Sequence, residues 1–281
     1  MSRVAIVTDS ASDLPPEVAQ RSGITVVPLV VSFGPESFRP GVNLTTEEFW
    51  QRMTAPDAPF PTTAAAAPGD FINAFQAAFD DGADSVVCIC VSGDLSGTLK
   101  SAEVARDQLS GREIHVIDTR SASMGEGMLA QIGAELAAEG VSAAEIARVL
   151  EHRKDDLRIF LALDTLEYLK RGGRISGARA AIGTMLNVKP IIAVENGIVE
   201  NAERVRSRPK ARERTLELLT QAPLERASIL HTTNGDIDEF MAGFMALSKL
   251  DPSRVQLMVV GPSVGPHLGP GCVGGVVLLK H

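Results

Sequence analysis

The chain of 281 residues contains few cysteines and aromatic residues: three cysteines, one tryptophan and one tyrosine. Three cysteines do not make a disulfide framework. Cys88 and Cys90 lie two positions apart in an apolar run, where they share one face of a strand, so we expect small buried hydrophobic side chains. Zinc sites use a different cysteine spacing with nearby histidines, and the histidines here are scattered. No metal or cofactor site is predicted.

Long hydrophobic runs are also absent. No uninterrupted apolar stretch reaches the roughly 18 residues that suggest a membrane-spanning helix, so stable membrane insertion is not expected. The N-terminal segment reaches a carboxylate at Asp9, too early for a signal peptide, and Val4–Thr8 has the pattern of a first strand. We therefore expect a cytoplasmic protein.

The chain lacks an excess of basic residues, because its formal net charge is −8. Residues 1–150 contain 9 basic and 20 acidic residues, a net charge of −11, whereas residues 151–281 contain 18 and 15, a net charge of +3. Binding to nucleic acid requires a broad basic face, so a general nucleic-acid partner is not expected. A local basic patch in the second half remains compatible with this distribution.

Strand-like and helix-like runs alternate in the first half of the chain. The predicted strands are Val4–Thr8, Ile24–Phe33, Val86–Val91 and Ile114–Asp118. The predicted helices are Pro16–Ser22, Thr46–Met53, Asp70–Asp81, Leu95–Leu109 and Ser123–Glu139. Alternation of this kind favours a mostly parallel sheet covered by helices, so residues 1–155 are predicted to form an α/β domain.

The second half is less regular, and a composition shift near Asp155 suggests a domain boundary there. Asn196-Gly197 between apolar runs predicts a β-hairpin. The other predicted strands are Ile159–Leu163, Ala227–Thr232, Val255–Val260 and Val273–Leu279. The predicted helices are Ser142–Asp156, Leu166–Arg171, Ala180–Leu186, Ser207–Gln221 and Asp236–Leu250. Residues 156–281 are therefore predicted to form an α+β domain, with a ligand site between the two domains and a contact from the loop near residues 60–70.

The turn Ser92–Thr98 follows an apolar strand and precedes a helix. Such a turn directs free backbone N–H groups and small hydroxyls at one point, which suits an anionic head group. Ser96 either caps the helix or offers its hydroxyl to a ligand, beside Gly97. The segment is not a Walker A loop, because Gly-Lys-Ser/Thr is missing, and it is not a Gly-x-Ser-x-Gly nucleophile elbow.

Two further loops contain hydroxyl or imidazole groups. Thr62 and Thr63 precede four alanines, where small residues let a ligand approach the backbone; the alternative is a plain loop. His267 lies in a glycine- and proline-rich loop, either facing a ligand or serving a structural role.

Basic residues gather in two segments of the second half. Arg171 and Arg174 flank two glycines, and arginine forks suit carboxylate and phosphate, although a basic helix end also offsets its own dipole. Arg204 and Arg206 would share one face of a strand, as a dock for an acidic group or simply as a solvated face.

Together these segments resemble the DegV family of bacterial fatty-acid-binding proteins. The resemblance rests on motifs that occur in order along the chain: Ile6–Ser10 with Asp13-Leu14, Pro61-Thr62-Thr63, Ser92 with Leu95–Thr98 and Ser101, Ile117–Thr119, Leu166–Gly177, Lys189-Pro190 and His267–Gly271. It implies one bound long-chain fatty acid with a buried acyl chain and a hydrogen-bonded carboxylate. It also implies a separate fatty acid kinase that phosphorylates the carboxyl group, a step linked to phospholipid synthesis.

The resemblance assigns the carboxylate contacts to Thr63 and Ser96, and the family's loop histidine to His267. Arg171, Arg174 and Arg206 would contact the acyl phosphate or the kinase. The family's Thr-Ser-x-Pro loop here reads Thr63-Ala64-Ala65-Ala66, so only its threonine is kept, and Thr62 is the alternative to Thr63 for a shift of one residue. The family's Ser-Ser pair reads Ser92-Gly93.

Burial of an acyl chain contributes about 0.8 kcal/mol per methylene, so the chain should supply most of the affinity and the head-group site should set the orientation. Ala180–Leu186 and the series Phe71, Phe75, Phe79 either line such a tunnel or form ordinary helix core.

Two other functions remain open from the residues alone. Ser96, Asp164 and His267 follow the Ser-Asp-His order of α/β-hydrolases, so an acyl hydrolase or transferase is the main alternative. A kinase or nucleotide-binding protein would require a phosphate loop with lysine, which the chain lacks.

Overall fold

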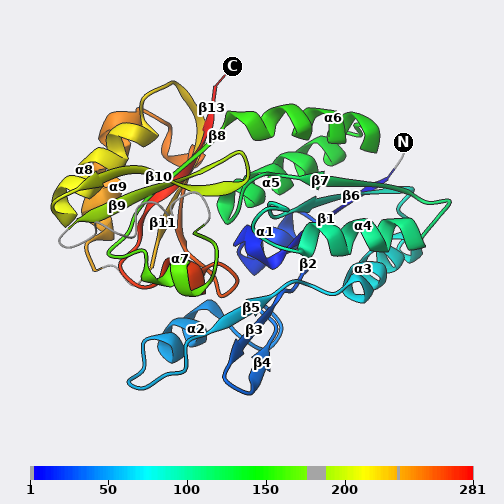
Figure 1. The fold of residues 1–281 in the computed structure, drawn as a ribbon. Helices are drawn as coiled ribbons and strands as arrows, with labels where there is room; N and C mark the ends of the chain where they lie inside the picture. The colour runs from blue at the N-terminus through cyan, green and yellow to red at the C-terminus, as the bar shows by residue number, and fades with distance from the viewer. Residues whose placement is uncertain (1–2, 176–187, 233–234, 281) are drawn as a thin grey trace.

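The computed structural model describes residues 3–175, 188–232 and 235–280 of the chain (Figure 1). The predicted helix Ala180–Leu186 lies outside these residues. Among the described helices, none is long and apolar enough to cross a membrane.

A four-stranded parallel sheet forms the centre of the N-terminal half, as the alternating pattern predicts. Its order is β2 (Ile24–Val27), β1 (Val4–Asp9), β6 (Ser85–Cys90) and β7 (Glu113–Asp118). One face packs against α3 (Pro68–Asp80) and α4 (Thr98–Gln108), and the other against α5 (Met124–Ala138) and α6 (Ala143–Arg153). The short helix α1 (Pro16–Arg21) adjoins β2.

A six-stranded mixed sheet forms the centre of the C-terminal half. Its order is β10 (Ile198–Val205), β9 (Lys189–Glu195), β8 (Leu157–Ala162), β13 (Val273–Leu279), β11 (Leu224–His231) and β12 (Val255–Val259). Only the β11–β12 pair is parallel. The predicted hairpin is confirmed as β9–β10, with Asn196 and Gly197 both at positive φ, as a tight two-residue turn requires.

The two sheets and their helices form successive layers with apolar cores between them (Figure 1). Strand residues alternate between cores: Val87 and Ile89 face α5, whereas Cys88 and Cys90 face α3 and α4. Both cysteines are fully buried, as expected for small hydrophobic side chains. Helices α8 (Arg208–Leu219) and α9 (Ile237–Ser248) cover the outer face of the six-stranded sheet.

A third, three-stranded sheet departs from the prediction. The expected single strand Ile24–Phe33 is two strands, β2 and β3 (Val30–Phe33), and β3 pairs with β4 (Glu36–Phe38) and β5 (Thr62–Ala64) in the small sheet. Pro28 separates the two strands; because proline has no N–H to donate, a continuous ladder cannot pass through it. Strand β5 contains Thr62 and Thr63, the residues for which a plain loop was one of the two interpretations.

Helix α2 (Thr46–Met53) anchors the small sheet to the C-terminal half. It begins at a capping box, in which the Glu48 N–H donates to Thr45 Oγ1 at 3.1 Å and the Thr45 N–H donates to Glu48 Oε2 at 2.9 Å. The indole N–H of Trp50 donates to the carbonyl oxygen of Val260 at 2.8 Å. The small sheet is thus held against the loop that follows β12.

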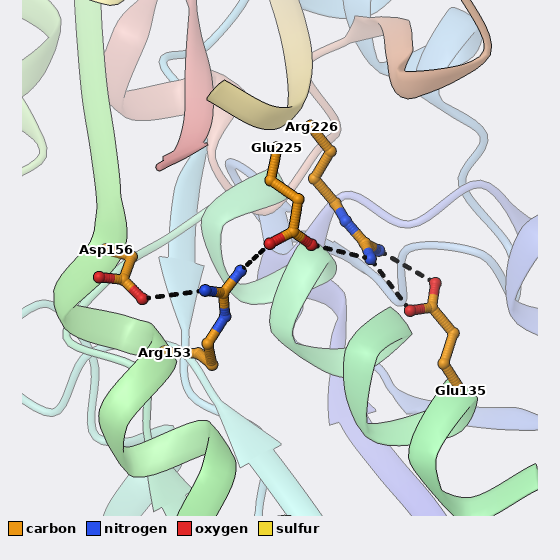
Figure 2. Close-up of polar contacts among 5 residues, drawn as sticks. All are labelled: Glu135, Arg153, Asp156, Glu225 and Arg226. Atoms are coloured by element: carbon orange, nitrogen blue, oxygen red, sulfur yellow. Dashed lines mark hydrogen bonds and ion pairs between the residues drawn. The ribbon is translucent and has the colours of Figure 1, made fainter. Parts of the chain in front are cut away.

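Helix α5 lies between the two larger sheets and shares one apolar core with both. An ion-pair network joins the same layers at the edge of this core (Figure 2). Arg226 on β11 donates to both carboxylate oxygens of Glu135 on α5 at 3.0 Å, and Glu225 accepts from both Arg226 and Arg153. Arg153 also contacts Asp156 at 3.3 Å.

We predict that Gly274→Ala destabilises the protein by about 1–3 kcal/mol, the usual range for overpacking. A Cβ at Gly274 would lie 2.1 Å from the carbonyl oxygen of Phe160 in the neighbouring strand, where only backbone movement relieves the clash. Gly69→Ala is the matched control, because a Cβ there meets no atom within 4 Å. Urea unfolding of both variants is the measurement, and equal midpoints would contradict the prediction.

Candidate functional site

An apolar cavity lies where loops at the carboxyl ends of the parallel strands meet the α5-facing side of the six-stranded sheet. Open α/β sheets commonly bind ligands at these strand ends. Ile159, Leu161 and Ile192 line one wall, and Ala11, Val91 and Leu95 line another. The empty space between the lining atoms totals about 720 Å³, part of it open to solvent.

Polar side chains from three separate parts of the chain gather on the cavity wall. Thr63 on β5, Ser96 in the turn after β6 and His267 on α10 (Gly265–Leu268) all line it. Thr63 Oγ1 and His267 Nε2 are hydrogen-bonded at 3.0 Å although they are 204 residues apart in sequence. The structure thus brings together three of the predicted ligand-binding residues on the wall of one cavity.

Ser96 forms hydrogen bonds at the start of helix α4 and also lines the cavity. Its Oγ accepts from the Thr98 N–H at 3.3 Å and is hydrogen-bonded to Thr98 Oγ1 at 2.9 Å. The helix begins at Thr98, three residues later than predicted, and its N-cap position is Gly97. The backbone turns at Ser92–Ser96 first, with the Ser96 N–H donating to the Ser92 carbonyl.

Arg174 also lines the cavity, with its guanidinium held by backbone carbonyls. Its Nε donates to the Leu95 oxygen at 3.1 Å and its Nη1 to the Gly172 oxygen at 2.7 Å. Burial, with a smaller contribution from the positive charge of Arg174, lowers the pKa of His267 to about 4, so the imidazole is neutral at physiological pH. Glycine at position 172 is required by close approach, because a Cβ there would lie 2.2 Å from His267 Nδ1.

Two buried aspartates join the loops around the cavity. Asp9, at the end of β1, accepts from the Ala11 N–H at 2.8 Å and the Val91 N–H at 3.0 Å. Asp13 accepts from the Ser123 hydroxyl at 2.6 Å and the Gly261 N–H at 3.0 Å. Ala11, Val91 and Ser123 all line the cavity, so the two carboxyl groups determine the position of its wall.

Burial raises the pKa of Asp9 to about 6 and that of Asp13 to about 7, despite the hydrogen bonds that favour their ionised forms. The pKa of Glu126 on α5 is also raised, by burial and by its proximity to Asp9. Glu126 Oε1 accepts from the Thr8 hydroxyl at 2.8 Å and the Asp9 N–H at 3.3 Å. The residues thus form a cluster of carboxyl groups beside the cavity, and burial favours their protonated forms.

Other predicted site residues lie elsewhere. Thr62 precedes Thr63 on β5 and is exposed, and Gly97 is not among the lining residues. Arg171 does not line the cavity; its guanidinium lies 3.9 Å from the ring centre of Phe60. Arg206 is exposed just beyond β10.

The phenylalanine series does not line the cavity. Phe71, Phe75 and Phe79 lie in the core between α3 and the parallel sheet, so ordinary helix core is the correct interpretation.

The hydrolase arrangement is not assembled in the described part of the chain. Asp164 pairs with Lys189 Nζ at 3.0 Å, while His267 Nε2 contacts Thr63 and Ser96 contacts Thr98. No hydrogen bond joins Ser96, Asp164 and His267 to one another among the described residues.

Comparison with known proteins shows which family this chain belongs to. A family model described as "Uncharacterised protein, DegV family" matches residues 3–280. The chain belongs to the DegV family. A DegV domain-containing protein of Caldanaerobacter subterraneus is 34% identical over 280 residues, which cover 98% of each chain.

Solved DegV family structures have the same fold. A DegV family protein from Thermus thermophilus, described by its fatty acid binding, has a TM-score of 0.90 at 36% identity and covers 99% of this chain and 100% of its own. A stearic acid-binding protein from Eubacterium ventriosum has a TM-score of 0.86 at 27% identity, covering 99% and 98%.

Within this DegV family chain, sequence reasoning missed the roles of Asp9, Asp13 and Ser123. The two aspartates belong to the N-terminal motif that carried the resemblance, but their burial against Val91 and Gly261 depends on contacts distant in sequence. A carboxylate directly after a buried strand was the available signal. Ser123, which precedes α5 and has a φ of 53°, carries no such signal in the sequence.

We predict that the titration of Asp13 lowers the free energy of unfolding as the pH rises from about 4 to 7. Its pKa of about 7 exceeds the ordinary value of 3.8, so the folded state binds the proton more tightly; the stabilisation is complete below about pH 4 and is lost through pH 7. Asp13→Asn removes this titration. The unfolding free energy of the wild type should therefore fall by roughly 2–4 kcal/mol relative to the variant across this range.

Chemical unfolding at several pH values is the measurement. Asp57→Asn is the control for the loss of one carboxylate, because Asp57 is exposed. Parallel pH profiles for wild type and Asp13→Asn would contradict the assignment of a raised pKa to Asp13.

Proposed function

We propose that this chain binds one long-chain fatty acid, with the acyl chain in the apolar cavity and the carboxylate directed at Thr63, Ser96 and His267. The observation that carries the proposal is a cavity with apolar walls and one group of hydroxyl, imidazole and guanidinium groups. The fatty acid binding described for similar DegV family structures supports it.

In this proposal, burial of the acyl chain of the fatty acid supplies most of the binding affinity. At about 0.8 kcal/mol per buried methylene, even half of an acyl chain of about sixteen carbons contributes more than a hydrogen bond to a charged group, about 1.5–3 kcal/mol. The side chains of wall residues such as Ile159 and Leu161 form no hydrogen bonds. The polar side chains on the cavity wall therefore set the direction in which the fatty acid lies.

The proposed head-group contacts follow from a neutral His267. When its Nε2 bears the proton, it donates to Thr63 Oγ1, and the Thr63 hydroxyl is left to donate to a carboxylate. Ser96 Oγ accepts from the Thr98 N–H, so the hydroxyl proton of Ser96 points away from that N–H. Arg174 supplies positive charge at the same wall. The site therefore offers donors and a cation to an anionic oxygen.

We predict that Thr63→Val and Ser96→Ala each weaken binding of palmitate or oleate about ten-fold or more, because each removes a hydrogen bond to a charged group. Thr62→Val is the matched control for Thr63→Val, since Thr62 occupies the same strand, is exposed and does not line the cavity. The measurement is a fluorescent fatty acid displacement titration of purified, delipidated protein.

The same preparation tests the proposal as a whole. Organic extraction and mass spectrometry of the undelipidated protein should release a long-chain fatty acid in a ratio near one to one. A lipid-free protein that also fails to take up added palmitate or oleate would exclude the proposed function.

We further propose that the chain is a carrier without turnover of its own, which presents the fatty acid to a separate fatty acid kinase and then holds the acyl phosphate. A kinase that consumes ATP implies a cytoplasmic setting. Arg171 and Arg206 are both exposed, and Arg174 lies at the cavity, so all three are proposed to contact the acyl phosphate or the kinase.

We predict that Arg171→Glu and Arg206→Glu together reduce acyl-phosphate formation by a fatty acid kinase at least ten-fold while leaving palmitate binding within two-fold of the wild type, because neither residue lines the cavity. Arg21→Glu, at an exposed position on α1, controls for charge reversal alone. Unchanged turnover with the double variant would exclude these two arginines from the kinase contact.

A further inference from the structure

A second cavity lies between helix α5 and the edge of the six-stranded sheet formed by β11 and β12. We call it the polar cavity; Gln131 and Glu135 come from α5, Arg226 and Ser228 from β11, and Gln256 from β12. The empty space among its lining atoms totals about 770 Å³, including an open mouth.

The polar cavity contains three buried polar atoms without a hydrogen-bond partner in the described part of the chain. They are Arg226 Nε, Ser228 Oγ and Gln256 Oε1. Ser228 is only 1% exposed. Leaving such atoms unpaired costs about 1–3 kcal/mol each, so native structures normally supply a partner.

The fold fixes the positions of these three groups. Ser228 and Gln256 are direct partners in the parallel β11–β12 register, so they lie beside each other on the same face of the sheet. The two terminal nitrogens of Arg226 each donate to Glu135 or Glu225 (Figure 2), whereas its Nε has no partner in the described part of the chain. The site is thus preorganised from two neighbouring strands and one helix.

The chemistry of the lining side chains limits the class of ligand that the polar cavity can bind. Arg226 Nε is a donor, Gln256 Oε1 is an acceptor and Ser228 Oγ is both. Glu135 and Glu225 pair with Arg226, which disfavours a phosphate dianion beside it, and the other lining arginine, Arg254, is exposed. No aromatic side chain is among the described lining residues, so the site lacks the stacking surface that a nucleobase uses. Met128 is the main apolar contact, which disfavours a second acyl chain.

A hydroxyl group matches this arrangement, because it accepts from one neighbour and donates to the next. We propose that the polar cavity is a second ligand site of this protein, and that it binds a small uncharged polyol or sugar. The site is separate from the fatty acid site, since the two cavities share no lining residue in the part of the chain that the structure describes. Because its walls come from α5 and from β11–β12, an occupant would contact both layers.

Saturation-transfer NMR with ribitol, myo-inositol and glucose as probes tests the proposal on the full chain. At least one probe should receive saturation from the wild type and retain it when palmitate is in excess. Ser228→Ala and Gln256→Leu should each weaken that binding about five-fold, the loss expected for one hydrogen bond. Ser85→Ala is the matched control, because Ser85 Oγ is another buried hydroxyl without a partner in the described chain, on β6.

Three results would overturn the proposal. The first is no saturation transfer to any of the three probes, which would mean that the polar cavity holds only water. The second is equal binding by the wild type, Ser228→Ala and Gln256→Leu. The third is displacement of the polyol by palmitate, which would assign the binding to the apolar cavity. None of these results argues against the proposed fatty acid site, which Thr63→Val and Ser96→Ala test separately.

Discussion

Hydrogen bonds to two buried carboxyl groups hold together the loops on which the candidate site depends. Asp9 joins the segment after β1 to the end of β6, and Asp13 joins it to the start of α5 and to the loop after β12. Each bond crosses between segments that the chain brings together only on folding. Burial without a cationic partner is unfavourable for a carboxylate, so the raised pKa values are the cost of this arrangement.

Around this junction the molecule places two cavities of opposite character against the same side of the six-stranded sheet. The apolar cavity lies near the carboxyl ends of the parallel strands, and the polar cavity lies at the β11–β12 edge beside α5. Helix α5 packs between the sheets, and Arg226 and Glu135 tie it to β11 (Figure 2). Ligand sites between packed layers recruit side chains from several elements without disturbing either sheet.

Local sequence signals predicted the elements well and the contacts between distant segments poorly. Short apolar runs located β1, β6 and β7, and Asn196-Gly197 located the hairpin. The small sheet was missed because β4 and β5 are three residues each and depend on pairing with β3. The family resemblance brought Thr63, Ser96 and His267 to one site, which no spacing along the chain indicates. The partners of Asp13 and the polar cavity depend on tertiary packing alone.

The central claim concerns where a fatty acid carboxylate lies in this DegV family chain. A crystal structure of the protein with palmitate tests it most directly. The account predicts the acyl chain between Ile159, Leu161 and Ile192, with a carboxylate oxygen within hydrogen-bond distance of Ser96 Oγ and Thr63 Oγ1. A palmitate whose carboxylate lies away from both hydroxyls, or whose chain lies outside the apolar cavity, would contradict it.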